Sequence, residues 1–255
     1  MPSHTDDPLN IATDAAALLL EAGSETYRAE DCVVRLSQAW GLEGVECFAM
    51  PTGLIASVNG RSMERCSIVR RISTRNVDLD RIAKLSALIE QAESGSLDVR
   101  SGRLAVDAIR KAPLPALGPA TLASAACAAF FALLFGGALP DALSAAGAGA
   151  LIALVRGALA RRAVPDFLMY IICGMITAAL AVTLNATGFL DSVDLMIIAS
   201  IMLLVPGLST VTAIRDTIAG DLVAGVARLA EAFITAAAIS MGVVIPLALE
   251  RMLLL

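Results

Sequence analysis

Four ionisable side chains lie beside an apolar stretch in the C-terminal part of the chain. Arg215 and Asp216 stand near the end of the segment 203–221, and Arg228 and Glu231 follow in the next apolar run. Ionisable groups at membrane depth are costly and often mark a substrate pathway or a proton relay. We interpret Arg215 and Arg228 as candidate counter-charges for a substrate carboxylate, and Asp216 and Glu231 as candidate proton-coupling groups. Arg228 and Glu231 could instead neutralise each other at a membrane interface.

The same apolar stretch contains a helix break. Pro206 removes a backbone hydrogen bond, and Gly207 lets the chain turn. Ser209, Thr210 and Thr212 follow and could cap a new half-helix, whose amino end would carry a partial positive charge. Broken helices of transporters hold substrate carboxylates in this way. The sequence therefore predicts a substrate site at the break, although an ordinary proline kink is the alternative.

A second charged motif lies near the N-terminus. In the run GSETYRAE, Glu25, Arg28 and Glu30 could form a carboxylate-based site, or they could be charges on a helix surface. The only histidine is His4, in a polar tail, so nucleophilic catalysis has no suitable base. The cysteines are scattered and show no metal-ligand spacing. We expect no catalytic residues, no metal and no cofactor.

The composition divides the chain into a polar half and an apolar half. The chain is 57% hydrophobic, with a mean hydropathy of +0.76. Of its 43 charged residues, 29 lie in residues 1–112. The net charge of −5 argues against a nucleic-acid partner, which would require a basic surface. The polar half is expected to face water, and the apolar half is expected to lie in a lipid bilayer.

The polar half, residues 1–112, is predicted to be a small α+β domain. Gly23 ends a first helix, and Ser24 is the expected N-cap of a second helix that ends at Gly41. Asn59 and Gly60 suit a tight hairpin between the second and third strands. The predicted helices cover 9–22, 24–41, 78–93 and 97–110, and the predicted strands cover 45–50, 54–58 and 65–73.

The apolar half, residues 113–255, is predicted to be a bundle of five transmembrane helices. A helix of about 20 apolar residues spans the hydrocarbon core of a bilayer. Five runs approach this length, and the fourth contains the break at 206–207. The predicted spans are 117–138, 141–160, 167–190, 195–214 and 222–249.

The basic residues predict an orientation for these spans. Arg110 and Lys111 precede the first span, Arg161 and Arg162 lie between the second and third, and Arg215 lies between the fourth and fifth. The other two loops contain no lysine or arginine. Basic residues concentrate in cytoplasmic loops. We therefore expect an inner (plasma) membrane protein with a cytoplasmic N-terminus and an external C-terminus.

Small residues recur at helical spacing in the second and third spans. Gly149, Ala153 and Gly157 repeat every fourth position, as do Gly174 and Ala178. Such repeats let helix backbones approach closely. An odd number of spans with this composition suggests a bundle that is completed by another chain, so we expect an oligomer.

Three segments resemble the threonine/serine exporter family, most closely its split, two-subunit form. They are LLEAGSETYRAEDCVVRLSQAWGLEGVECFAMPTGLIASV (19–58), RRISTRNVDLDRIAKL (70–85) and LLVPGLSTVTAIRDTIAGDLVAGVARL (203–229). The more specific features are the Tyr27-Arg28 step, the Pro51-Thr52-Gly53 run between strands, and the Pro206-Gly207 segment.

The resemblance implies a function for the chain. It implies a cytosolic N-terminal domain, a five-helix membrane half, and proton-driven export of a small carboxylate such as threonine, serine or a dicarboxylate like succinate. In the split form this chain would be the larger subunit, with a small membrane partner. Two alternatives are a membrane-anchored sensor or regulator, and a membrane-bound hydrolase that uses Glu25 or Glu30.

Overall fold

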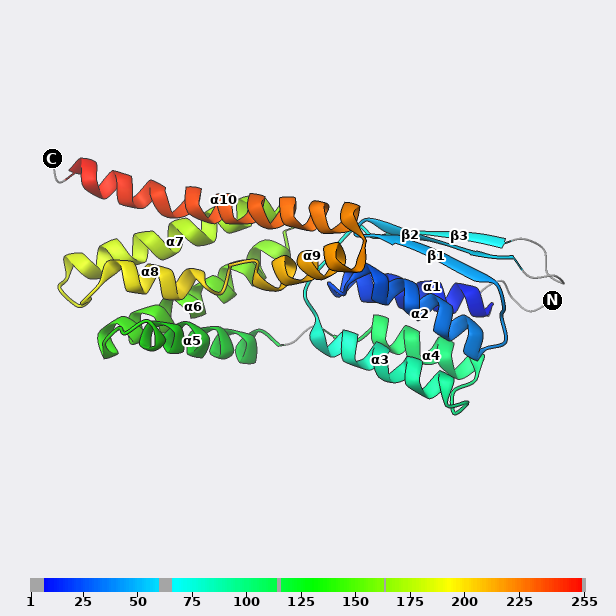
Figure 1. The fold of residues 1–255 in the computed structure, drawn as a ribbon. Helices are drawn as coiled ribbons and strands as arrows, with labels where there is room; N and C mark the ends of the chain where they lie inside the picture. Colours follow the sequence, from blue (N-terminus) through cyan, green and yellow to red (C-terminus); the bar gives the residue numbers. More distant parts are fainter. Residues whose placement is uncertain (1–6, 60–65, 114–115, 163, 254–255) are drawn as a thin grey trace. The chain divides into compact units, whose positions relative to one another are not determined.

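The computed structural model describes residues 7–59, 66–113, 116–162 and 164–253 (Figure 1). These residues form two compact units. The first contains the described residues up to 113 together with 207–230, and the second contains the described residues of 114–206 and 231–255. The N-terminal unit therefore includes a segment that the sequence analysis assigned to the membrane half. His4 lies outside the described residues.

The N-terminal unit consists of three layers. Helices α1 and α2 lie between a sheet on one side and helices α3 and α4 on the other (Figure 1). Helix α9 packs at α2, and the first turns of α10 complete the unit. The elements are α1 (Pro8–Glu21), α2 (Thr26–Ala39), β1 (Val45–Met50), β2 (Gly53–Val58), β3 (Cys66–Arg71), α3 (Leu79–Glu93), α4 (Val99–Arg110), α9 (Gly207–Ala219) and α10 (Leu222–Leu253).

The sheet is antiparallel, in the order β1-β2-β3. Pro51 and Thr52 form the turn between β1 and β2, so that Met50 lies opposite Gly53. The predicted small sheet is confirmed. The predicted hairpin at Asn59 and Gly60 falls in part outside the described residues, because Gly60 is not among them.

Helix α1 forms the centre of the N-terminal unit. Asp7 caps it by accepting a hydrogen bond from the backbone N–H of Leu9 at 3.3 Å, and Pro8 occupies the first turn, where its missing N–H costs nothing. The helix is buried on all sides from Ile11 to Leu20, since it contacts both neighbouring layers. Burying each leucine of this helix contributes roughly 1.5–3 kcal/mol.

One buried carboxylate fastens α1 to its neighbours. The carboxylate of Asp14 forms ion pairs with three arginines. They are Arg70 of β3 at 3.0 Å, Arg103 of α4 at 2.7 Å and Arg110 at the end of α4 at 3.2 Å. Three cations around one buried anion compensate its desolvation and fix the position of α1 between the layers.

The second unit is helical. It contains α5 (Leu117–Leu134), α6 (Leu139–Ala160), α7 (Asp166–Ala186), α8 (Val193–Ile201) and α10 from Glu231 onward. Among the described residues, four helices have the length and apolar composition needed to cross a membrane: α5, α6, α7 and α10.

The prediction of five spans is not confirmed, because the expected span over 195–214 is not one helix. Helix α8 has nine residues and α9 has thirteen, and the chain from 202 to 206 between them forms turns. At 1.5 Å per residue, they reach about 14 Å and about 20 Å, against a hydrocarbon core of about 30 Å. The break that the sequence predicted at Pro206 thus separates two helices, each too short to span a bilayer alone.

The small residues of the second unit lie at close helix contacts, as predicted. A Cβ atom added to Gly149 of α6 would stand 2.6 Å from the carbonyl oxygen of Ser124 in α5. A Cβ atom added to Gly174 of α7 would stand 2.7 Å from the carbonyl oxygen of Ile239 in α10. These glycines therefore allow backbone-to-backbone contact that any side chain would prevent.

Candidate functional site

The start of helix α2 has an unusual cap. Gly23 adopts a φ of +83°, which turns the chain from α1 into α2. The predicted N-cap, Ser24, is wrong by one residue: Glu25 is the N-cap, and its side chain makes no capping hydrogen bond. Instead, the backbone N–H of Thr26 donates to Oδ1 of Asp216 in α9 at 3.0 Å. An acceptor 190 residues away in sequence thus satisfies the first N–H of α2.

Asp216 and Arg228 form a buried ion pair within the N-terminal unit. Oδ2 of Asp216 lies 2.9 Å from Nε of Arg228, and the two side chains are 0% and 5% exposed. Arg228 also donates from Nη2 to the backbone carbonyl of Ser24 at 2.7 Å. A buried charge of this kind is tolerated only when it is paired and hydrogen-bonded, so the two residues depend on each other and on the start of α2.

A single hydroxyl group joins two carboxylates at this place. Oγ1 of Thr26 lies 3.0 Å from Oδ1 of Asp216 and 2.9 Å from Oδ2 of Asp221. Because the hydroxyl has one proton, it can donate to only one of the two carboxylates at a time. Thr26 can therefore alternate between Asp216 in α9 and Asp221 in the turn before α10.

Glu25 carries a second, more exposed set of ion pairs. Its Oε1 lies 2.8 Å from Nη1 of Arg215, and its Oε2 lies 3.6 Å from Nη1 of Arg28. Burial would raise the pKa of Glu25, but the hydrogen bond from Arg215 and the charges of Arg28 and Arg215 lower it below its ordinary value. Glu25 is thus an anion at neutral pH. The Arg215 side chain is 61% exposed, so this contact is open to solvent.

Glu30 lies one turn further along α2. Its Oε1 accepts a hydrogen bond from the backbone N–H of Ala49 in β1 at 2.7 Å. Burial raises the pKa of Glu30, and the charges of Asp221 and Asp216 raise it further, against the hydrogen bond from Ala49. The pKa of Glu30 therefore depends on the charges of the same two carboxylates that contact Thr26.

The structure brings together two motifs that the sequence analysis treated as separate sites. The polar cluster, as we call it below, joins the start of α2 to α9 and the start of α10. Its members are Ser24, Glu25, Thr26, Arg28, Glu30, Arg215, Asp216, Asp221 and Arg228.

Three members of the polar cluster, Ser24, Thr26 and Asp221, were missed as functional residues. Thr26 was not singled out, and Ser24 was expected to act only as a cap. Neither helical periodicity nor local spacing relates Thr26 to Asp216, because the contact spans 190 positions. The only feature of the sequence that pointed to a contact between the two motifs is that both carry charged residues of opposite sign.

The remaining predicted site residues lie elsewhere. Pro206 is the last residue of the turns between α8 and α9, and Gly207 opens α9. Ser209 and Thr210 therefore lie inside the first turn of α9 rather than at its cap, which corrects the expected capping position. Glu231 is the first residue of α10 that belongs to the second unit.

The polar cluster suits binding and charge exchange rather than covalent chemistry. Its arginines are guanidinium cations at any physiological pH, and its carboxylates accept their hydrogen bonds. Among the described residues, no group of three or more histidine, cysteine, aspartate or glutamate side chains could hold a metal ion. An exchange of carboxylate partners on an arginine, or of a proton on a carboxylate, needs only the groups that are present.

Comparison with known proteins identifies relatives of the chain. The profile of a family described as "Putative threonine/serine exporter" matches residues 10–250. A "Probable threonine/serine exporter" of Mycobacterium tuberculosis is 27% identical over 96% of this chain, which spans 46% of that protein. A "Probable succinate transporter subunit YjjP" of Klebsiella aerogenes is 24% identical over 92% of this chain and 90% of its own length.

A YjjP protein of Escherichia coli with the same description is 24% identical over 90% of this chain and 89% of its own length. No solved structure matches the chain. The family profile covers both the N-terminal helices and sheet and all four apolar helices. The chain is therefore a multi-pass membrane protein that belongs to the threonine/serine exporter family, whose members are transporters and not enzymes.

Proposed function

We propose that the chain is a subunit of a proton-coupled secondary exporter of small carboxylate metabolites. The observation that carries this proposal is the buried ion pair between Asp216 and Arg228. The pair joins a titratable group to a carboxylate-binding group at 2.9 Å, in the segment that follows the helix break. In membrane proteins, ionisable residues that pair with one another often mark substrate pathways and proton relays.

The pair suggests how a proton and a substrate would be coupled. Asp216 occupies the guanidinium edge of Arg228 that a substrate carboxylate would use. A substrate with both a carboxylate and an ammonium group would bind Arg228 through the carboxylate and the ionised form of Asp216 through the ammonium. A proton on Asp216 removes the charge that holds the ammonium, so proton and substrate weaken each other's binding, because the linkage is reciprocal. Since the two compete for the site, a proton entering the cell can be exchanged against a substrate leaving it.

The helix break supplies the proposed path for the substrate. We assign the substrate contacts to Pro206, Gly207, Ser209 and Thr210 at the start of α9, with Arg215 and Arg228 as counter-charges. The amino end of α9 carries a partial positive charge that attracts a carboxylate. Glu231, on α10, is the second proposed proton-coupling group.

The proposed membrane placement follows from the basic residues. Arg110 and Lys111 precede α5, and Arg161 and Arg162 directly follow α6. We infer that these ends face the cytoplasm of an inner membrane, with residues 1–112 as a cytosolic domain. We further infer that α8 and α9 together make a fifth crossing besides α5, α6, α7 and α10, which would put the C-terminus outside.

The relatives suggest both a substrate class and a partner. One relative is named for threonine and serine and two for succinate, and all of these molecules are small carboxylates. Two relatives are named as subunits, so we infer that a second membrane chain joins this one. Large apolar side chains such as Phe130 of α5 and Phe233 of α10 are exposed, which suits contact with lipid or with such a partner.

Efflux from right-side-out vesicles tests the proposal. Vesicles that contain the chain and its partner are loaded with labelled threonine or labelled succinate and placed in acidic medium. We expect rapid efflux of at least one substrate, and its loss in Asp216→Asn and Glu231→Gln. Asp194→Asn, an exposed carboxylate in the first turn of α8, is the matched control. Efflux that persists in Asp216→Asn would refute the proposed coupling, and unchanged efflux in Glu231→Gln would remove Glu231 from it.

A further inference from the structure

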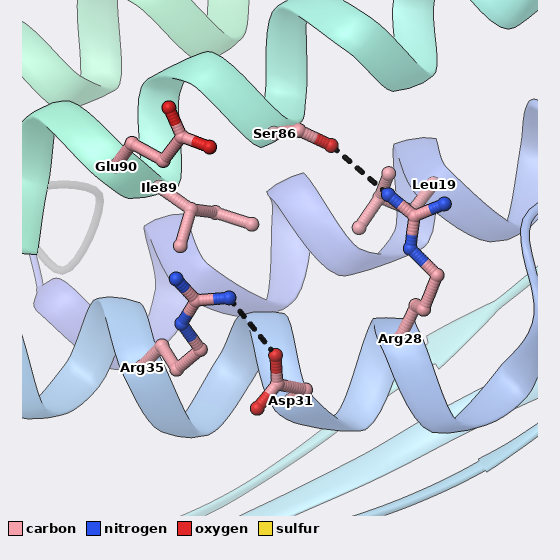
Figure 2. Close-up of a pocket in the computed structure, with 7 residues that line it drawn as sticks. All are labelled: Leu19, Arg28, Asp31, Arg35, Ser86, Ile89 and Glu90. Atoms are coloured by element: carbon pink, nitrogen blue, oxygen red, sulfur yellow. Dashed lines mark hydrogen bonds and ion pairs between the residues drawn. The ribbon is translucent and has the colours of Figure 1, made fainter.

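A cavity of about 170 Å³ lies in the N-terminal unit, apart from the helix break. Figure 2 shows Arg28 and Arg35 of α2 facing Ser86, Ile89 and Glu90 of α3. Leu19 of α1 and Asp31 of α2 complete the lining. The volume is below the roughly 300–1,000 Å³ of drug-sized ligand sites, so the cavity suits a metabolite of a few heavy atoms.

The two arginines of the cavity are not equivalent. Arg35 donates from Nε to Oε1 of Glu93 at 2.6 Å, and its Nη2 reaches the other oxygen of the same carboxylate. Its Nη1 also donates to Oδ2 of Asp31 at 3.2 Å. These hydrogen bonds raise the pKa of Arg35 and lower that of Glu93. Arg35 is thus fully engaged by carboxylates of the protein.

Arg28 is oriented but not neutralised in the same way. Its Nη2 donates to Oγ of Ser86 at 3.0 Å, and Ser86 donates its own proton to the carbonyl of Ile82 at 2.9 Å. The carboxylate beside Arg28 is Glu25, at 3.6 Å, which is longer than a hydrogen bond, and Glu25 is bound more closely by Arg215. Arg28 therefore keeps donors for a ligand carboxylate.

A carboxylate lies across the cavity from Arg28. Glu90 follows Ser86 by one turn of α3, about 6 Å along the helix axis. Within the described residues, no hydrogen bond or ion pair engages its carboxylate. Figure 2 shows Glu90 and Arg28 on opposite sides of the side chain of Ile89. The cavity therefore offers an anion and a cation that are separated by a short apolar surface.

This arrangement selects the charge pattern of a ligand. A small zwitterion can place its carboxylate on Arg28 and its ammonium on Glu90, with its side chain against Leu19 and Ile89. A dicarboxylate would bring its second anion to Glu90 and Asp31, where like charges repel it. The lining thus favours one negative and one positive group over two negative groups.

We propose that this cavity is a binding site for a small α-amino acid, distinct from any site at the helix break. The ligand carboxylate takes Arg28 as its partner, and the ligand ammonium takes Glu90. Binding also draws Arg28 away from Glu25, which then pairs with Arg215 alone. The occupied cavity therefore acts on the polar cluster and reports the amino-acid concentration to α9.

Titration calorimetry on the full chain in detergent tests this proposal. The probes are L-alanine, L-serine and L-threonine, with succinate, threonine amide and N-acetylthreonine for comparison. We expect saturable binding of at least one amino acid and at least tenfold weaker binding of the three comparison probes. Arg28→Gln, Arg28→Lys and Glu90→Gln are each expected to weaken amino-acid binding at least tenfold, because each alters one of the two charged contacts.

Matched controls and a paired comparison make the test specific. Arg100→Gln and Glu43→Gln change exposed side chains outside the cavity and should leave the affinity unchanged. If Glu90 binds the ammonium, N-acetylation and Glu90→Gln should remove the same contact, so their effects should not add. Melting curves establish that the variants are folded.

Three results would overturn the proposal. They are no saturable binding of any amino acid to the native chain, amino-acid binding that Arg28→Gln and Glu90→Gln leave unchanged, and tighter binding of succinate than of every amino acid. The test requires no pH gradient and no partner chain. Absence of efflux from vesicles that contain the native chain would therefore count against the proposed export and not against this site.

Discussion

At the scale of single residues, Asp216 is the most deeply buried charged residue of the polar cluster. It is fully buried, it caps α2 through the N–H of Thr26, and it pairs with Arg228. A buried ion pair is weak evidence for stability as such, because desolvation offsets much of the attraction. Removing one partner, however, leaves the other charge buried without compensation, and that loss can be predicted.

We predict that Asp216→Asn lowers the free energy of unfolding by about 3–5 kcal/mol, since Arg228 then loses its counter-charge. The double variant Asp216→Asn, Arg228→Met removes both charges and should be clearly more stable than the sum of the two single changes implies. Thermal unfolding of the full chain in detergent measures this coupling, with Asp194→Asn as the exposed control. Additive effects of the two changes would contradict the buried pair.

The polar cluster also predicts a pH dependence at Glu25. Its pKa is lowered in the folded chain from an ordinary value of 4.5, so the folded state binds this proton less tightly than the unfolded state does. The stabilisation is therefore fully present above about pH 4.5 and is lost as the pH falls through the lower folded pKa. Glu25→Gln should reduce stability at pH 7 by about 1 kcal/mol, because Arg215 is exposed to solvent.

The same variant should flatten the acid limb of the stability curve. Melting temperatures measured from pH 3 to pH 7 would show it, with Glu43→Gln as an exposed control on the loop before β1. Curves of native chain and Glu25→Gln that run parallel down to pH 3 would contradict the assignment of Glu25 as the titrating group.

At the scale of elements, the sequence predicted most helices because local signals define their ends. Asp7 and Asp78 cap α1 and α3, and Gly23 ends the first helix, so the predicted bounds of α1 to α4 differ from the observed ones by at most two residues. The predicted C-terminal ends of α5, α7 and α10 differ from the observed ones by four residues. The count of spans was less successful. The run 195–214 was counted as one span because it is long enough to cross a membrane. It contains Pro206, however, and a count based on length alone ignores the helix break that this proline causes.

The long-range arrangement of α9 could not be predicted at all. The pairing of Asp216 with Thr26 and of Arg228 with Ser24 depends on how the chain returns after four helices of the second unit. Periodicity and capping patterns describe neighbours within a few turns, and they carry no information on contacts over 190 positions. Six of the nine members of the polar cluster were therefore named as candidates from the sequence, but their common place in the fold was not predicted.

Helix α6 offers a test of packing within one element. A Cβ atom at Gly149 would lie 2.6 Å from the Ser124 carbonyl of α5, whereas a Cβ atom at Gly147 would meet nothing within 4 Å. We expect Gly149→Ala to destabilise the chain by about 1–3 kcal/mol, because the backbones must separate. Gly147→Ala should be neutral or stabilising by up to about 1 kcal/mol, because alanine favours helix. Equal melting temperatures for the two variants would contradict the close contact of α5 and α6.

At the scale of the whole molecule, the chain crosses between its two units three times. Helices α5 to α8 are inserted into the N-terminal unit, which is completed only when α9 and the start of α10 return. The N-terminal residues up to 113 therefore lack the α9 and α10 partners of Ser24, Glu25 and Thr26 until residues 207–230 are present. This organisation predicts that the chain can be cut after residue 113 into two fragments, and that the fragments will reassociate through the contacts of the polar cluster.

We predict that residues 1–113 and residues 114–255, produced as two chains in one cell, will purify together through a tag on the second. The contact should depend on the buried pair and the cap of α2, so Asp216→Asn and Thr26→Val should each reduce the recovered N-terminal chain severalfold. Asp194→Asn and Glu43→Gln should not, because both side chains are exposed outside the polar cluster. Efflux from vesicles should follow the recovery, since the proposed coupling groups sit in the reassembled unit. Stable fragments that never purify together, or a recovery that Asp216→Asn and Thr26→Val leave intact, would show that the polar cluster does not hold α9 to α2.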